Sequence, residues 1–277
     1  MSIQNSVIPK KIHYCWFGHN PKPELIQRCI QSWHKFLPDY EIIEWNEDNF
    51  DISFCQFAQD AYHAKKWAFV SDVARLKVIY DHGGIYMDTD VELFDSKIFH
   101  DYLDSNAFFF FDNNKGINTG VGFGGKKSDP LIKRMIATYE VAAFTHDDLL
   151  SIACPVLNTP DIQEFVLDFK RDGGYQTFDN YTFIPESHYY KHAKHYGTFT
   201  WRSDEQNKAL KYVRKNRTVS KVRQRLRSHA IFKFFRKYHL NLVERVYAFV
   251  VYDLFDYGIK YWLVRLWLKI SNYWRRK

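Results

Sequence analysis

The chain has 277 residues, enough to bury one substantial core, and its composition does not indicate a second large domain. The net charge of +7 is unevenly divided, because residues 208–277 hold 19 of the 39 Lys and Arg but 3 of the 32 Asp and Glu, so that this segment carries +16 and residues 1–207 carry −9. An acidic body with a basic, aromatic tail predicts an enzyme that sits on a negatively charged surface.

The four cysteines form no Cys-x-x-Cys pair and no short regular framework, so neither a zinc site nor a disulfide scaffold is indicated. They fit a reducing compartment. The first residues, MSIQNSVIPKK, lack the apolar segment of a signal peptide and any anchor. We therefore expect a protein that is not secreted and has no N-terminal membrane span.

The first part of the chain predicts a strand, a helix and a second strand. Residues 8–18 (IPKKIHYCWFG) favour a strand that runs into a loop. A helix is expected after Pro23, because the apolar residues between positions 25 and 37 form one stripe. Residues 40–45 (YEIIEW) predict the second strand, and this order predicts a parallel sheet with right-handed crossovers. Another helix is expected near residues 55–65.

Residues 69–94 (FVSDVARLKVIYDHGGIYMDTDVELF) predict a helix, a glycine turn and a short strand. Asp72 and Arg75 share one face of the helix, which can point a carboxylate and a guanidinium at one ligand. The glycines at 83–84 supply the left-handed cap that ends the helix, and the apolar run at 85–87 is typical of a buried strand.

Asp88 and Asp90 lie where this strand is expected to end. Residues two apart in an extended chain project to the same side, so both carboxylates can face one divalent cation and the phosphates that it carries. Ligands in open α/β sheets bind at such carboxyl ends. An isolated Asp-x-Asp is more often a solvated turn, so the surrounding motifs decide between the two interpretations.

Further along, residues 107–111 (AFFFF) predict a buried strand and residues 117–124 (INTGVGFG) a glycine-rich segment. That segment is not a P-loop, because it lacks the Gly-Lys-Ser/Thr of that motif and a clear helix after it. Asn118 is either a substrate contact or a turn residue bonded to its own backbone. A helix is expected from Asp129-Pro130 to position 143.

The tail, residues 208–277, alternates basic and aromatic residues. This pattern is compatible with nucleic-acid binding, because Lys and Arg side chains neutralise phosphates and aromatic side chains stack on nucleobases. Between residues 242 and 270, however, apolar residues dominate and charges recur at roughly helical intervals. The longest charge-free run nearby, residues 246–252, is far too short to span a bilayer. We therefore expect amphipathic helices on an anionic membrane surface, with packing on the body or on a second subunit as the alternative.

The motifs between residues 8 and 201 resemble those of glycosyltransferase family 32, the nucleotide-sugar transferases with a DXD sugar-binding region. The resemblance rests on IPKKIHYCWFG, Asp72-x-x-Arg75, GGIY, Asp88-x-Asp90 and INTG. Relatives of the family include bacterial capsular and O-antigen polysaccharide transferases, fungal initiating mannosyltransferases and the glucosyltransferase domain of clostridial toxins. The family closes its catalytic domain with a histidine six residues before a tryptophan, as His195 and Trp201 do here, although Tyr196 replaces the second histidine of the family's pair.

The resemblance implies an α/β fold of the GT-A (Rossmann-like) kind over residues 1–207, followed by C-terminal amphipathic helices over 208–277. It implies catalytic roles for Asp72, Arg75, Asp88 and Asp90, and Mn²⁺ or Mg²⁺ held by Asp90, His195 and Asp88, with His192 as a weaker candidate. It also implies the following donor-binding residues: Trp16, Phe17, Gly18, Asp72, Arg75, Gly84, Tyr86, Asp88, Thr89, Asn118 and Trp201. Trp16 would stack on the nucleotide base, whereas residue type alone favours a core role.

The function implied is retaining transfer of a hexose from a nucleotide diphosphate sugar, with UDP-galactose or UDP-glucose favoured. The acceptor would be a sugar hydroxyl of a growing, lipid-linked surface polysaccharide or oligosaccharide. We expect a cytoplasmic enzyme, peripheral on the inner face of the cytoplasmic membrane, that binds no nucleic acid, with a homo-oligomer as the alternative use of the tail. The competing hypotheses are a basic nucleic-acid-binding protein and a catalytically silent sugar-binding domain.

Overall fold

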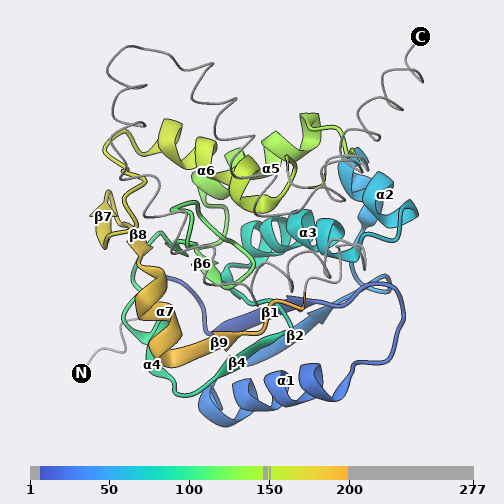
Figure 1. Cartoon of the computed structure of the whole chain (residues 1–277), viewed down its shortest axis with the longest axis horizontal. Helices are drawn as coiled ribbons and strands as arrows, with labels where there is room; N and C mark the ends of the chain where they lie inside the picture. Colours follow the sequence, from blue (N-terminus) through green and yellow to red (C-terminus); the bar gives the residue numbers. More distant parts are fainter. Residues whose placement is uncertain (1–6, 146–148, 150, 199–277) are drawn as a thin grey trace, which may run out of the picture. The chain divides into compact units, whose positions relative to one another are not determined.

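A computed structural model of the chain describes residues 7–145, 149 and 151–198. Helices cover both faces of a central sheet (Figure 1), with α1 on one face and α3, α5 and α6 on the other. The predicted α/β fold is confirmed. The predicted boundary at residue 207 and the tail, 208–277, lie outside the described residues.

The strand order in the main sheet of the described chain is β2-β1-β3-β6-β5-β8-β7. The strands are β1 Lys11–Cys15, β2 Glu41–Trp45, β3 Gly84–Tyr86, β5 Ala107–Phe110, β6 Phe123–Gly125, β7 Gln176–Phe178 and β8 Tyr181–Ile184. β1 runs parallel to both β2 and β3, and β5 runs parallel to β8, so the parallel pairing predicted for the first two strands is confirmed. β6 is antiparallel to β3 and β5, as β7 is to β8, which makes the sheet mixed.

Seven α-helices lie within the described residues: α1 Glu24–Phe36, α2 Gln56–His63, α3 Trp67–His82, α4 Lys97–His100, α5 Pro130–Val141, α6 Cys154–Phe165 and α7 Glu186–His192. A single 3₁₀ turn, Ile52–Phe54, precedes α2. The helices expected after Pro23, near residues 55–65, before the glycine pair and after Asp129 are all present. Asp129 caps α5 by accepting hydrogen bonds from the backbone N–H groups of Leu131 and Ile132.

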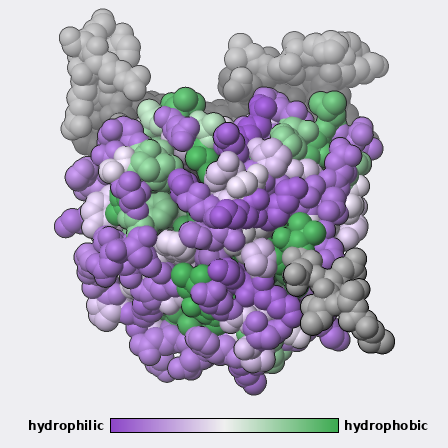
Figure 2. Space-filling model, turned by 180° about the vertical axis from the view of Figure 1, so that it is seen from behind, coloured by the Kyte–Doolittle hydropathy of each residue, from purple (hydrophilic) through white to green (hydrophobic). Residues whose placement is uncertain are grey.

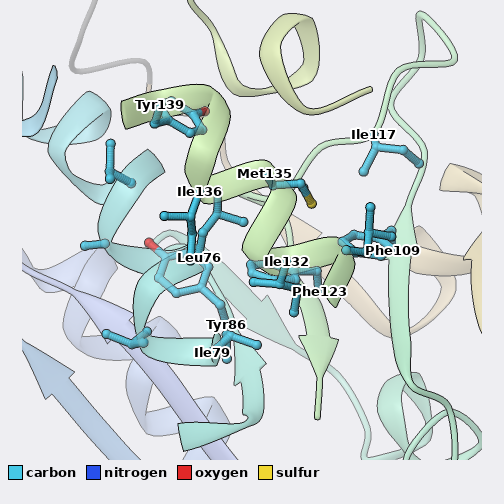
Figure 3. Packing of buried hydrophobic residues seen from close by; sticks show 14 of the residues in the cluster. Leu76, Ile79, Tyr86, Phe109, Ile117, Phe123, Ile132, Met135, Ile136 and Tyr139 are labelled. Atoms are coloured by element: carbon cyan, nitrogen blue, oxygen red, sulfur yellow. The ribbon is translucent and has the colours of Figure 1, made fainter. Parts of the chain in front are cut away.

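The two faces of the sheet support two hydrophobic clusters. Phe109, Phe123 and Tyr86 face α3 and α5, as Figure 3 shows, whereas Phe108 and Phe110 pack on the opposite side. This alternation follows from the two-residue period of a strand. Burial of each of these rings contributes roughly 1.5–3 kcal/mol, which fixes the register of the sheet and therefore the place where each strand ends.

β6 includes the end of the glycine-rich segment, for which the sequence predicted no strand. A Cβ atom on Gly124 would come within 2.3 Å of the Phe108 ring, and one on Gly125 within 2.4 Å of Ile132 Cδ1. Glycine is therefore required because aromatic and aliphatic side chains already fill the space on both faces.

A second, two-stranded sheet joins β4, Val91–Leu93, to β9, Ala193–His195. No helix in the described ranges has both the length and the apolar composition needed to cross a membrane. Figure 2 shows one largely hydrophilic face of the molecule with separate hydrophobic areas.

Candidate functional site

The Asp88-Thr89-Asp90 segment follows β3, at the carboxyl end of a buried strand, as predicted. Met87 is held by a hydrogen bond from its N–H to the His13 carbonyl, and Asp88 by one from its N–H to the Gly120 carbonyl. The chain then turns directly into β4. Both carboxylates are therefore attached to backbone that the sheet fixes on two sides.

His195 reaches the two aspartates because β9 pairs with β4, with His195 opposite Val91. Its Nε2 lies 3.0 Å from Asp90 Oδ1 and 3.9 Å from Asp88 Oδ2. One ligand atom from each of the three residues lies within 4.8 Å of the other two. Two carboxylate oxygens and an imidazole nitrogen are ligands that Mn²⁺ accepts, and the oxygens also suit Mg²⁺, so these residues fit the cation implied by the sequence.

The two aspartates have different electrostatic surroundings. Burial raises the pKa of Asp88 above its usual range, although the Arg75 charge opposes this shift. Burial also opposes ionisation of Asp90, but hydrogen bonds to His195 and Thr198 and the His195 charge hold its pKa below the usual range. Burial would lower the pKa of His195, but the hydrogen bond to Asp90 and the charges of Asp90 and Asp88 hold it above its ordinary value.

Arg75 joins the cluster from α3. Its guanidinium lies 3.1 Å from Asp72 Oδ1 and 3.1 Å from Asp88 Oδ1, and its Nε donates to the Ser71 carbonyl. It also lies over the Tyr86 ring, whose hydroxyl donates to Asp88 Oδ1 at 3.1 Å. Arg75 is only 3% exposed, so its contact with Asp72 is a buried ion pair and not one on the surface of the helix. Burial raises the pKa of Asp72 to about 7, against the attraction of Arg75.

Asn118 and two residues that the sequence did not identify as site residues complete this side of the cluster. Asn118 Oδ1 accepts a hydrogen bond from the Gly120 N–H, the turn-stabilising arrangement considered for it from the sequence. A Cβ atom on Gly120 would lie 2.5 Å from Asp88 Oδ2 and 3.0 Å from Arg75 Nη1. The Cys154 sulfur lies 3.8 Å from Asn118 Oδ1 and 3.9 Å from Arg75 Nη1. In the sequence, Gly120 belongs to the INTG motif and Cys154 precedes Pro155, and these were the available signals for the two residues.

The loop after β1 holds three further residues of the predicted donor site. Trp16 is partly buried, and its Nε1 donates to the Asn20 carbonyl at 2.7 Å. Phe17 is buried against Phe50, with the ring centroids 5.9 Å apart. Gly18 has a φ of +94°, and a Cβ atom there would meet a neighbouring indole ring at 2.7 Å. Trp16 is thus the one of the three with a partly exposed aromatic side chain.

The remaining predicted residues lie in varied places. Gly84 is enclosed within the sheet, where a Cβ atom would lie 2.8 Å from the Lys11 carbonyl oxygen, and Thr89 is partly buried between the two aspartates. His192, the weaker metal candidate, is instead paired with Asp95, 2.8 Å from Nδ1 to Oδ2. Trp201 lies outside the described residues.

His13 is a buried residue that supports the site, and the sequence predicted no role for it. It is fully buried, its Nδ1 accepts from Trp45 Nε1 at 3.0 Å, and its Nε2 lies 2.9 Å from the Gly83 carbonyl oxygen. Because an indole only donates, the proton of neutral His13 is on Nε2 and is donated to Gly83. His13 therefore connects β1 to the turn between α3 and β3. This turn links the helix that carries Arg75 to the strand that leads to Asp88.

The Asp88-Thr89-Asp90 segment lies within a region that matches a known protein family. Residues 23–109 match the family model described as the glycosyltransferase sugar-binding region containing DXD motif. The chain is 26% identical to Inositol phosphoceramide mannosyltransferase 3 of Schizosaccharomyces pombe over 153 residues. The aligned region covers 52% of this chain and 41% of that protein. Over 115 residues the chain is 27% identical to Subversion of eukaryotic traffic protein A of Legionella pneumophila, 32% of this chain and 18% of that protein. The chain thus spans less than half the length of these curated relatives.

Solved structures similar to this chain include the PaToxG glycosyltransferase, at 17% identity and a TM-score of 0.44, covering 58% of this chain and 70% of that one. Another is a glycosyltransferase involved in the glycosylation of the major capsid of PBCV-1, at 12% identity and a TM-score of 0.37, covering 70% and 95%. The family match confirms the resemblance found in the sequence, because residues 23–109, which hold Asp72, Arg75, Asp88 and Asp90, match the glycosyltransferase sugar-binding region of the DXD type.

Proposed function

We propose that the protein is a metal-dependent retaining glycosyltransferase that moves a hexose from a nucleotide diphosphate sugar to a hydroxyl of a saccharide. The observation that carries this proposal is the convergence of Asp88, Asp90 and His195 beside the buried Arg75, within and next to the matched sugar-binding region. His195 is brought to the aspartates from more than 100 residues away by strand pairing, which a solvated Asp-x-Asp turn would not require.

Asp90 and His195 would hold the divalent cation directly, and Asp88 would bind the ribose or the cation through water. A cation bound there supplies Lewis-acid stabilisation of the charge on the departing diphosphate, a contribution of several kcal/mol. Asp90 is suited to this role because its low pKa keeps it ionised at neutral pH.

Arg75 and Asp72 would bind the hydroxyls of the transferred sugar. Arg75 is held by Asp72, Asp88 and the Ser71 carbonyl, so its guanidinium needs little reorganisation when the substrate binds. The chain offers no clear covalent nucleophile in this cluster. We therefore propose retention by internal return, in which the acceptor hydroxyl attacks the face that the diphosphate leaves.

The donor and acceptor are narrower proposals. UDP-galactose or UDP-glucose is favoured by the resemblance, and the mannosyltransferase among the relatives adds a mannose donor as the competing choice. The name of that relative, which refers to inositol phosphoceramide, also supports a lipid-linked acceptor. The basic and aromatic composition of residues 208–277 supports a peripheral position on the cytoplasmic side of the membrane, with subunit contact in a homo-oligomer as the alternative.

The test is incubation of the full chain with a panel of UDP- and GDP-sugars, with and without Mn²⁺, followed by measurement of released nucleotide. We expect one donor to be turned over only when the divalent cation is present. Donor binding without any release of nucleotide would mean a catalytically silent sugar-binding domain. Turnover that is unaffected by chelation would contradict the cation role.

Sedimentation with vesicles tests the membrane proposal. The full chain should pellet with vesicles that contain anionic lipid and less so at high salt, because exposed charges are screened over a Debye length of roughly 8–10 Å. Burial of aromatic side chains should leave a salt-resistant bound fraction. A chain that ignores vesicles and sediments alone as a discrete oligomer would support subunit contact instead.

A further inference from the structure

The segment that follows β9 wraps around Asp90. The backbone N–H of Tyr196 donates to the Asp90 carbonyl at 3.0 Å. The backbone N–H and hydroxyl of Thr198 both donate to Asp90 Oδ2, at 2.8 and 3.1 Å, while His195 faces Oδ1. Both oxygens of this carboxylate are therefore oriented by residues 195–198.

Strand pairing alone is a weak support for this segment. β9 has three residues, and His195 is the last of them. A two-stranded ladder of this length is marginal by itself, whereas a cation site needs its ligands held to roughly 0.5 Å. An additional anchor for the chain beyond His195 is therefore expected.

Tyr196 has the contacts of such an anchor. Its hydroxyl donates to Glu92 Oε2 at 2.5 Å and accepts from Arg28 Nη2 at 2.9 Å. Arg28 Nε lies 3.3 Å from Glu92 Oε1, which closes the network into a ring of three side chains. Lys194 Nζ lies 4.2 Å from the centroid of the Tyr196 ring.

The network is attached to a rigid part of the fold. Arg28 belongs to α1, which is docked on β4 through two buried hydrogen bonds. Trp33 Nε1 donates to the Val91 carbonyl at 2.7 Å, and the Leu93 N–H donates to Ser32 Oγ at 2.9 Å. α1 therefore offers a fixed reference for the chain that carries His195 and Thr198.

We propose that Tyr196, held by Glu92 and Arg28, is a positioning residue for the cation site. It acts through the segment 195–198, which it locks so that His195 and Thr198 orient the two oxygens of Asp90. This inference rests on the proposed function, in which Asp88, Asp90 and His195 hold a divalent cation.

The test compares Tyr196→Phe with a matched control in the full chain. The variant keeps the ring and the contact with Lys194 but removes both hydrogen bonds of the hydroxyl. The control is Tyr14→Phe, because the Tyr14 hydroxyl donates to Glu44 at 2.6 Å and Glu44 is paired with Lys22, a similar network between β1 and β2. Binding of Mn²⁺ alone is measured by electron paramagnetic resonance, and thermal unfolding midpoints are recorded for all proteins.

We expect Tyr196→Phe to raise the dissociation constant for Mn²⁺ about five- to tenfold, and Tyr14→Phe to leave it unchanged, with similar small shifts of the unfolding midpoint. Glu92→Gln, in which the amide oxygen still accepts from the Tyr196 hydroxyl, should retain most of the affinity. Wild-type affinity in Tyr196→Phe, or an equal loss in the control, would overturn the proposal.

Hydrogen exchange of the metal-free protein separates this inference from the proposed function. The amide protons of Tyr196 and Thr198 should be protected in the wild type and exchange at least about tenfold faster in Tyr196→Phe, but not in Tyr14→Phe. If the wild type binds no Mn²⁺, the cation site is contradicted, and with it this role of Tyr196, whatever the exchange rates show. If the wild type binds Mn²⁺ but exchange does not depend on Tyr196, the positioning role alone fails.

Discussion

The guanidinium of Arg75 lies 3.1 Å from the carboxylate of Asp88, which joins the middle of α3 to the segment after β3. Arg75 also pairs with Asp72, so its buried guanidinium is shared by the buried carboxylate of Asp72 and the partly buried carboxylate of Asp88. Removing one member of such a group leaves charge without compensation in a poorly solvated place. The contact therefore matters both for the stability of the fold and for the arrangement of the site.

Arg75→Gln should lower the free energy of unfolding by about 3–5 kcal/mol, because Asp72 and Asp88 lose their shared partner. The measurement is urea denaturation at pH 7.5. The double variant Asp72→Asn/Arg75→Gln removes one of the two uncompensated carboxylates and should recover part of the loss. A decrease below about 1 kcal/mol in the single variant would show that solvent compensates these charges, contrary to the burial described.

Gly120→Ala should weaken Mn²⁺ binding by about tenfold or more, equivalent to about 1.4 kcal/mol. The reason is that the added Cβ would lie 2.5 Å from Asp88 Oδ2, so that this carboxylate must move. Gly116→Ala is the control, because its Cβ would meet the Pro155 side chain at 3.3 Å and neither aspartate of the site. Isothermal titration with Mn²⁺ distinguishes the two variants, and equal affinities would contradict the placement of Asp88.

His13 should make stability depend on pH. Burial lowers its pKa to about 4, whereas the unfolded chain takes up this proton near pH 6.5. The unfolded state therefore binds more protons between pH 6.5 and 4, and stability is lost as the pH falls through this window. Between pH 7.5 and 5.0 the contribution is about 2 kcal/mol.

His13→Gln retains a donor for the Gly83 carbonyl but does not titrate. Urea denaturation at pH 7.5 and 5.0 should show that the variant loses about 2 kcal/mol less than the wild type on acidification. The same dependence on pH in both proteins would mean that His13 is protonated in the folded state.

Trp16→Ala should weaken the binding of free UDP or GDP by about 1–3 kcal/mol, the usual contribution of an aromatic ring stacked on a base. Turnover at saturating donor should change less, because the ring lies outside the cluster around Asp88. Trp16→Phe keeps an aromatic face and should retain most of the affinity. If calorimetry finds the same affinity in Trp16→Ala as in the wild type, the side chain belongs only to the hydrophobic core.

The sequence predicted the parts of the site that are encoded locally. The spacing of Asp72 and Arg75 places them on one face of α3, and the glycine pair ends that helix before β3. His195 was found only through its spacing to Trp201 in the family resemblance, because a single histidine carries little information.

Other parts depend on contacts between distant residues. β6 was missed because Phe-Gly-Gly has weak strand propensity, and its glycines are explained only by the side chains of Phe108 and Ile132. α6 has no clear apolar stripe and contains Pro160, so the pattern did not predict a helix. The bond between Arg28 and Tyr196 joins residues 168 positions apart, which sequence spacing cannot show.

Asp90→Asn tests whether a cation held at Asp90 is needed for glycosyl transfer. Asn retains an oxygen that can accept the hydrogen bonds from Thr198 and has nearly the same volume, so the fold should persist, as circular dichroism can verify. The measurement is the rate of nucleotide release from the preferred donor across a titration of Mn²⁺. We predict that the wild type is activated by Mn²⁺ and that folded Asp90→Asn shows no transfer at any concentration. A variant that matches the wild type at limiting Mn²⁺ would contradict the account.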